Sequence, residues 1–137
     1  MFTHAELNLV LDDSFSELES DEFDLLLSNG EAVVSITRIS FVAAMNQGIS
    51  DTYTAKGFGA FFMHNSGKSD EIFMCGDLPY YTYTEKGEER ELFYTVTFYR
   101  SRYAYFTVAY ATEISNKDKW ADRFLEIGNS AELIYPE

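Results

Sequence analysis

The strongest constraint on the fold of this chain is the block of residues 91–134, which is typical of two paired β-strands followed by one amphipathic helix. The first strand, Glu91–Arg100, alternates in hydrophobicity, and one face carries Leu92, Tyr94, Val96 and Phe98. The second strand, Tyr103–Thr112, follows a turn at residues 100–102. A strand pair in series with a helix predicts an α+β domain in which the helix covers a face of an antiparallel sheet.

Further strand signals extend this sheet along most of the chain. Asp24–Ser28 and Glu31–Ser40 are joined by Asn29-Gly30, the pair that favours a two-residue type I′ hairpin turn. Other strands are expected at residues 7–11, 70–75, 78–84 and 131–135. We therefore predict a single α+β domain over residues 1–137, with a mainly antiparallel sheet of about 7–8 strands flanked by two helices.

The last helix is the clearest helical element and is predicted over Asn116–Gly128. Ser115 and Asp118 are spaced like a capping box at its start, and Gly128 is expected to end it. Its predicted apolar face consists of Trp120, Ala121, Phe124 and Leu125.

The sequence pattern of residues 41–66 fits either helices or strands. Asp51 or Thr52 can cap a helix that runs to about His64, with Gly67 at the C′ position. The competing prediction is a strand through Phe58–Met63, since glycines at positions 57 and 59 disfavour a helix. Residues 41–45 can prolong the preceding strand or begin a helix, and Gly48 ends either.

The charge of the chain excludes some partners. Its 23 acidic and 10 basic residues give a formal net charge of −13, which opposes binding to nucleic acid and to anionic membranes. The densest cluster is Asp12, Asp13, Glu17, Glu19, Asp21, Glu22 and Asp24. It lacks the Asp-x-Asp-x-Asp-Gly pattern of a calcium loop. It is predicted to be either a solvated connector or a face that meets a basic partner.

Residues suited to catalysis are few. The chain has two histidines, His4 and His64, and one cysteine, Cys75, which falls in a predicted buried strand and is interpreted as a packing residue. The sequence has no zinc-ligand cluster, no Gly-x-Ser-x-Gly motif and no phosphate-binding loop. We therefore predict a protein that is not an enzyme and uses no metal or cofactor. An enzyme built on scattered carboxylates, with His64, is the third and weakest hypothesis.

Tyrosines gather between residues 80 and 110, where they suit a binding surface because each combines apolar area with a polar tip. Alternation places Tyr103 and Tyr105 on the face of Thr107, and Tyr110 on the opposite face. The predicted binding residues are Tyr81, Tyr83, Tyr103 and Tyr105. Cross-strand stacking that only stabilises the sheet is the alternative.

The order of these elements also carries a family resemblance. Its parts are the hairpin Asp24–Ser40, the helix after it, Tyr80–Tyr83, Phe93–Phe98, Tyr105–Thr112 and the closing helix that runs into Asn129–Leu133. This pattern resembles the PsbP-like superfamily, which includes the PsbP photosystem subunits, the bacterial DcrB-type proteins and the Ran-binding import factor Mog. The resemblance implies a non-catalytic binding or accessory subunit, and it carries over no catalytic residue.

Many bacterial members of that superfamily are exported lipoproteins, whereas this sequence shows no signal peptide and no lipobox cysteine. We therefore expect a cytoplasmic protein. The leading functional prediction is a domain that binds a basic partner protein, in an accessory or immunity-type role. The alternative is a small-molecule binder with an aromatic pocket between the sheet and the helix Asn116–Gly128. The oligomeric state stays open.

Overall fold

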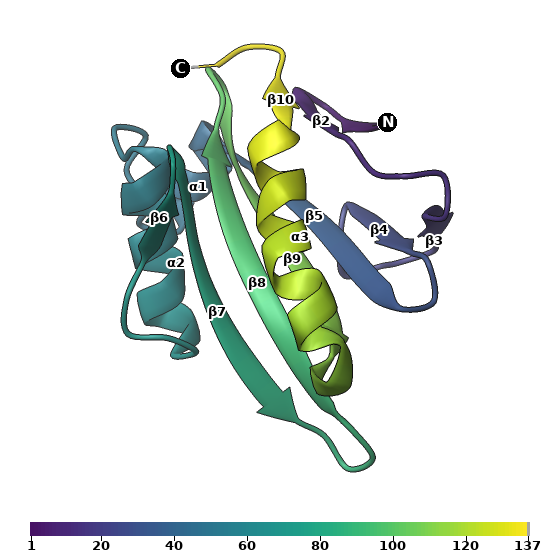
Figure 1. The fold of residues 1–137 in the computed structure, drawn as a ribbon. Helices are drawn as coiled ribbons and strands as arrows, with labels where there is room; N and C mark the ends of the chain where they lie inside the picture. The colour runs from purple at the N-terminus through teal and green to yellow at the C-terminus, as the bar shows by residue number, and fades with distance from the viewer. Residues whose placement is uncertain (137) are drawn as a thin grey trace.

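The computed structural model describes residues 1–136. Its main element is a seven-stranded antiparallel sheet with the strand order β3-β4-β5-β9-β8-β7-β6 (Figure 1). The strands are β3 (Ser16–Leu18), β4 (Leu25–Ser28), β5 (Ala32–Ser40), β6 (Phe73–Cys75), β7 (Leu78–Lys86), β8 (Glu91–Arg100) and β9 (Ala104–Glu113). A three-stranded antiparallel sheet is formed by β1 (Phe2–His4), β2 (Leu7–Leu9) and β10 (Glu132–Leu133), with β2 in the centre. The predicted α+β class is confirmed.

Within residues 1–136, three α-helices accompany the sheets: α1 (Phe41–Asn46), α2 (Ala55–Ser66) and α3 (Lys117–Ser130). The extra helix relative to the prediction is α1, which begins where the Ser40 hydroxyl accepts a hydrogen bond from the Ala43 N–H. In Figure 1, α3 lies in front of the large sheet and α2 lies behind its β7 side. Within residues 1–136, no helix is both long enough and apolar enough to cross a bilayer.

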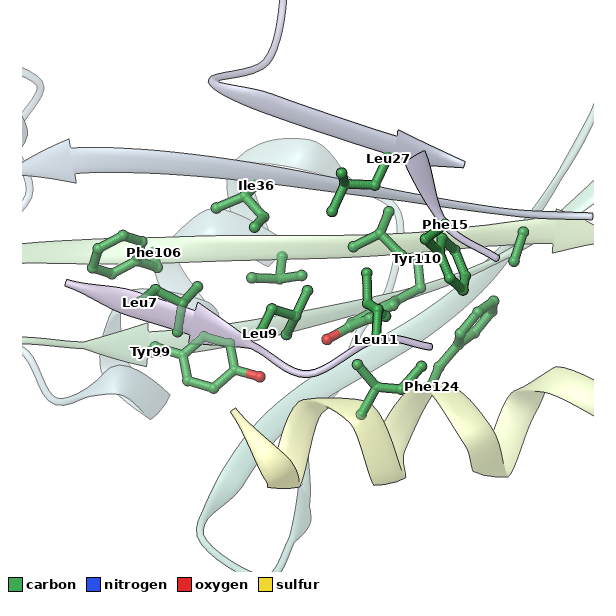
Figure 2. Packing of buried hydrophobic residues seen from close by; sticks show 14 of the residues in the cluster. Leu7, Leu9, Leu11, Phe15, Leu27, Ile36, Tyr99, Phe106, Tyr110 and Phe124 are labelled. Atoms are coloured by element: carbon green, nitrogen blue, oxygen red, sulfur yellow. The ribbon is translucent and has the colours of Figure 1, made fainter. Parts of the chain in front are cut away.

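The core under α3 is completed by the N-terminal segment. Leu7, Leu9 and Leu11 lie between the sheet and α3, together with side chains from the long strands (Figure 2). From α3, Phe124 reaches the same cluster and is fully buried. Both ends of the chain therefore contribute to one hydrophobic core.

The helix alternative for the middle of the chain is confirmed by α2. Thr54, rather than the predicted Asp51 or Thr52, caps its start by accepting from the Gly57 N–H at 3.1 Å, and Gly67 ends it with a φ of 66°. Gly59 faces the sheet, where a Cβ would lie 2.6 Å from Cδ2 of Phe98. The glycine that counted against a helix is thus what lets α2 lie directly on β8.

Several local predictions are wrong. The first is the type I′ turn at Asn29-Gly30: Ser28 pairs with Val33, the Asn29 N–H donates to the Ala32 carbonyl, and only Gly30 has a positive φ. A type I′ turn needs positive φ at both central residues. The Asn29 side chain instead accepts from the Ala32 N–H at 2.7 Å. The turn therefore spans Asn29–Ala32, one residue further along the chain than predicted.

The second wrong prediction is the buried strand around Cys75. β6 is a short edge strand whose Phe73 and Met74 are exposed, and Cys75 itself is half-buried. The Asn129 amide donates to its sulfur at 3.1 Å. An apolar run alone does not distinguish an edge strand from a central one.

The ends of α3 also differ from the prediction. A 3₁₀ turn, Ile114–Asn116, precedes the helix, and no side chain caps its start, so the predicted capping box is not formed. Gly128 does not end the helix, which continues to Ser130. A Cβ at Gly128 would lie 2.7 Å from Cδ2 of Leu78, and the Gly128 carbonyl accepts from the Tyr99 hydroxyl at 2.8 Å. The glycine therefore serves close packing rather than helix termination.

Replacing Gly128 by alanine is expected to lower the free energy of unfolding by about 1 kcal/mol, because the cost of overpacking exceeds the gain in helix propensity. The matched control is Gly57→Ala in α2, where the new Cβ meets no atom closer than 3.5 Å. That variant should be as stable as the parent or more so. Urea denaturation of both variants measures the difference, and a stabilised Gly128→Ala protein would contradict the packing argument.

Candidate functional site: an apolar slot beside α2

Part of the sheet face that carries α2 is left uncovered. α2 packs against β7 and β8, and α1 packs against β5. Between α2 and the β4 side of the sheet lies a hollow of 560 Å³, which we call the slot. Its lining is mostly apolar and comes from Glu22, Phe23, Leu26, Val33, Ser35, Thr37, Phe62, Ser66, Lys68, Tyr81, Tyr83, Leu92, Tyr94, Val96, Thr107, Ala109 and Ala111.

The floor of the slot is formed by small side chains on two paired strands. β5 and β9 place Val33 opposite Ala111, Ser35 opposite Ala109 and Thr37 opposite Thr107. These side chains point away from α3, because the alternate residues of both strands fill the core on the other face. Small residues at the centre and larger residues at both sides give the face its concave shape.

One wall of the slot is aromatic. Tyr83 and Tyr94 stack across β7 and β8 with ring centroids 4.6 Å apart and planes 8° apart. Phe62 of α2 stands on the same side and keeps 38% of its surface exposed. Burial raises the pKa of Tyr81, Tyr83 and Tyr94. A tyrosine hydroxyl is already neutral at ordinary pH, and this shift keeps it further from ionisation, so all three remain hydrogen-bond donors.

A lysine borders this wall but brings little free positive charge. Lys68 Nζ lies 2.5 Å from a Glu85 carboxylate oxygen and 5.6 Å from the centre of the Tyr83 ring. The hydrogen bond to Glu85, and then its charge, raise the pKa of Lys68. The lysine is thus protonated and neutralised by its neighbour.

The opposite wall is formed by the acidic segment before β4 and by β4 itself. Phe23 and Leu26 give it apolar contacts, and Glu22 adds a carboxylate to the lining. Two further exposed acids, Glu19 and Asp21, precede Glu22 in the same segment. Within residues 1–136, none of these three carboxylates has an ion pair. The slot is therefore apolar inside and negative along one rim.

The four predicted binding tyrosines do not come together. Tyr81 and Tyr83 line the slot, whereas Tyr105 is fully buried under α2 and donates to the carbonyls of Ser50 and Tyr53, both at 2.8 Å. Tyr103 lies in the turn before β9, exposed and packed edge-on against Tyr135. Tyr110 lies on the α3 face, as the alternation predicts.

The apolar hollow is also not where a pocket was expected. The interface between the sheet and α3 is filled by stacked rings, with Phe124 between Tyr110 and Trp120. A more polar cleft of 940 Å³ lies at the C-terminal end of α3, where Asn129 and Asp77 face the start of α2. The aromatic hollow lies on the other face of the sheet.

Sequence reasoning missed the floor of the slot. Because side chains alternate along a strand, Val33, Ser35 and Thr37 share one face, and so do Thr107 and Ala109. The composition of this face could therefore be predicted from the sequence. No local signal tells which part of that face α2 covers. Among the described residues 1–136, no group of three His, Cys, Asp or Glu side chains is placed to hold a metal ion.

Comparison with known proteins identifies the fold. No family model and no curated protein matches the sequence. A crystal structure of a protein from Bacteroides thetaiotaomicron VPI-5482 matches over 94% of this chain with a TM-score of 0.60 and 14% identity. The solution structure of cyanobacterial PsbP (CyanoP) from Synechocystis sp. PCC 6803 matches over 93% of this chain and 86% of its own length, with a TM-score of 0.58 and 15% identity. This chain has a PsbP-like fold.

At such low identity the likeness concerns the arrangement of the strands and helices alone. The chain spans less than half, 45%, of the matched Bacteroides protein. This fold agrees with the PsbP-like resemblance that was inferred from the order of the predicted strands and helices.

Proposed function

We propose that this PsbP-like chain is a non-catalytic binding domain that takes a segment of a basic partner protein into the slot, in an accessory or immunity-type role in the cytoplasm. The observation that carries the proposal is the mostly apolar slot between α2 and the acidic segment 19–24. A contiguous apolar hollow with a polar rim is typical of an interaction site in a folded protein. Neutral tyrosines on its wall suit such a surface, because they add apolar area and hydrogen-bond donors.

The charge of the chain supports a basic partner. A net charge of −13 attracts cationic proteins over a distance set by the ionic strength. Glu22 at the slot rim, which has no ion pair within residues 1–136, gives this attraction a place beside the apolar contacts. Binding should therefore weaken with salt, while apolar contacts in the slot keep part of the affinity.

The test is capture from a lysate of the native organism with the immobilised protein, washed at low and at high salt and read by mass spectrometry. Val33→Lys places a charged chain at the slot, where Val33 is 37% exposed. Val42→Lys makes the same change on α1, where the side chain is 71% exposed and outside the slot lining. We expect one basic protein to be retained by the parent and by Val42→Lys, to be lost from Val33→Lys, and to be reduced by salt.

Two results contradict parts of the proposal. Equal capture by both lysine variants would place the partner elsewhere on the surface. Capture that is unchanged at high salt would remove the electrostatic contribution. Circular dichroism of both variants controls for folding.

A small molecule in the same slot is the second candidate, because 560 Å³ lies within the range of ligand pockets and the lining is mostly apolar and aromatic. A ligand well above its Kd raises the melting temperature by linkage. A thermal-shift screen should then find compounds that stabilise the parent and Val42→Lys but not Val33→Lys. A flat screen would count against this candidate.

A further inference from the structure

We infer that the segment received by the slot is an amphipathic helix with an apolar stripe and with basic residues on the flank that faces Glu22. This inference rests on the proposed function, and it adds the conformation and the charge pattern of the partner segment. Four features of the slot carry it: its distance from α2, its length, its shape and its one-sided charge.

The distance argument follows from the strand order. α2 packs over β7 and β8, and the floor of the slot is β5 and β9, the next two strands of the sheet. Strands are spaced about 4.8 Å apart, so the centre of the slot lies roughly 10 Å from the line that α2 covers. Helices pack side by side at about 8–10 Å. A second helix in the slot would therefore lie next to α2, as two helices do when they share one face of a sheet.

The length of the slot suits a short helix. Its floor runs from Val33 to Thr37 on β5 and from Ala111 to Thr107 on β9. Four residue steps of a strand cover about 14 Å. A helix rises about 1.5 Å per residue, so the slot takes roughly nine residues, or between two and three turns. One apolar stripe of such a helix presents side chains at i, i+3, i+4 and i+7.

The shape of the slot favours a helix over a single extended strand. The small residues Ser35 and Ala109 lie at the centre of the floor, between the Phe62 side and the Leu26 side. A helix with its side chains is about 10–12 Å across, which is close to the width of two strand spacings. Half-exposed Phe62 would gain a packing partner from such a helix.

The charge is asymmetric across the slot. On the α2 side, Lys68 is neutralised by Glu85. On the other side, Glu22 lines the slot, and neither it nor Glu19 or Asp21 has an ion pair within residues 1–136. Lysine or arginine on the flank toward Glu22 would be attracted, while acidic residues there would be repelled. The charges therefore favour one orientation of the helix about its own axis.

The experiment is a peptide-display selection on the full chain with two mixed libraries of about 14 residues, a length near the lower limit for isolated helices. One library carries apolar residues at helical spacing and the other at alternate positions, and both vary Lys and Glu at the polar positions. We expect enrichment of helix-patterned, Lys-rich peptides. Their affinity should fall at least about tenfold on Val33→Lys and stay unchanged on Val42→Lys.

A charge variant tests the flank separately. Glu22→Gln should weaken the enriched basic peptides, whereas Glu126→Gln on the exposed side of α3 should not. If both changes have the same effect, the one-sided charge argument is overturned.

The outcomes separate this inference from the proposed function. Enrichment of alternating peptides that are sensitive to Val33→Lys would overturn the helix and leave the slot as the binding site. Enriched peptides of either pattern that ignore Val33→Lys would overturn the slot itself, and with it the proposed function. No enrichment of either pattern above a protein-free control also overturns the helical segment.

Discussion

Replacing Phe124 by alanine is expected to lower the free energy of unfolding by about 4 kcal/mol, the largest effect of a single substitution that we predict. The Phe124 side chain has no exposed surface, and its ring stacks between Tyr110 at 5.2 Å and Trp120 at 5.5 Å, measured between centroids. Truncation removes this ring from the layer that joins α3 to β9 and leaves a cavity that rigid neighbours cannot fill. Urea denaturation followed by far-ultraviolet circular dichroism measures the loss.

Leu125→Ala is the matched control for Phe124→Ala, because it shortens the next side chain of the same helix at a half-buried position. Its cost should be about 1 kcal/mol, since less apolar area is involved and water already reaches the side chain. The packing argument for α3 would fail if the two variants lost equal stability.

Glu6→Gln is expected to cost about 2–3 kcal/mol, because it breaks a partly buried charge pair. Glu6 is 7% exposed; one carboxylate oxygen accepts from Arg38 Nε at 2.9 Å, and the other accepts from the Ser101 hydroxyl at 2.5 Å. The neutral amide would leave the Arg38 charge without its counter-ion at this site. The effect should appear in urea denaturation at neutral pH.

The control for Glu6→Gln is Glu85→Gln, which removes an ion pair of similar geometry at the surface. Glu85 and Lys68 are both about half exposed, and their contact is 2.5 Å. Solvent and salt screen such a pair, so this variant should unfold like the parent. A larger loss from Glu85→Gln than from Glu6→Gln would mean that burial does not decide the strength of these pairs.

The sequence predicts the long strands of this protein well, because their signals are local. β8 has the predicted bounds, Glu91–Arg100, and β9 begins and ends one residue later than predicted. Alternation of side chains also assigns both faces of β9 correctly, with Tyr105 on one side and Tyr110 on the other. The short edge strands are less well predicted: β3 falls in the acidic stretch expected to be a connector, and β6 lies within the predicted strand 70–75 but is not buried.

The roles of two helix glycines were predicted wrongly, because each role depends on which side chain of the sheet lies opposite the glycine. Gly59 was counted against α2, and Gly128 was expected to end α3. Each instead stands where a side chain of the sheet comes too close for a Cβ: Phe98 in the first case and Leu78 in the second. A local propensity scale contains no information about such contacts.

The candidate site was predicted only in part. Tyr81 and Tyr83 lie in it, and the tyrosine-rich face was readable from alternation. The position of the slot depends on how much of the sheet a 12-residue helix covers, and hence on long-range packing. For the same reason Tyr105 could not be distinguished from Tyr83 in the sequence, although Tyr105 is fully buried under α2 and Tyr83 is only partly buried.

The small sheet that joins the two ends of the chain has a consequence for synthesis on the ribosome. Leu7 and Leu9 of β2 are fully buried, but their partner strand β10 consists of residues 132–133, and the Ile134 N–H donates to the Glu6 carbonyl at 2.8 Å. These late residues leave the ribosome after every strand of the large sheet has emerged. A nascent chain is therefore expected to complete the face that carries the slot before the leucine-rich layer on the opposite face receives β10.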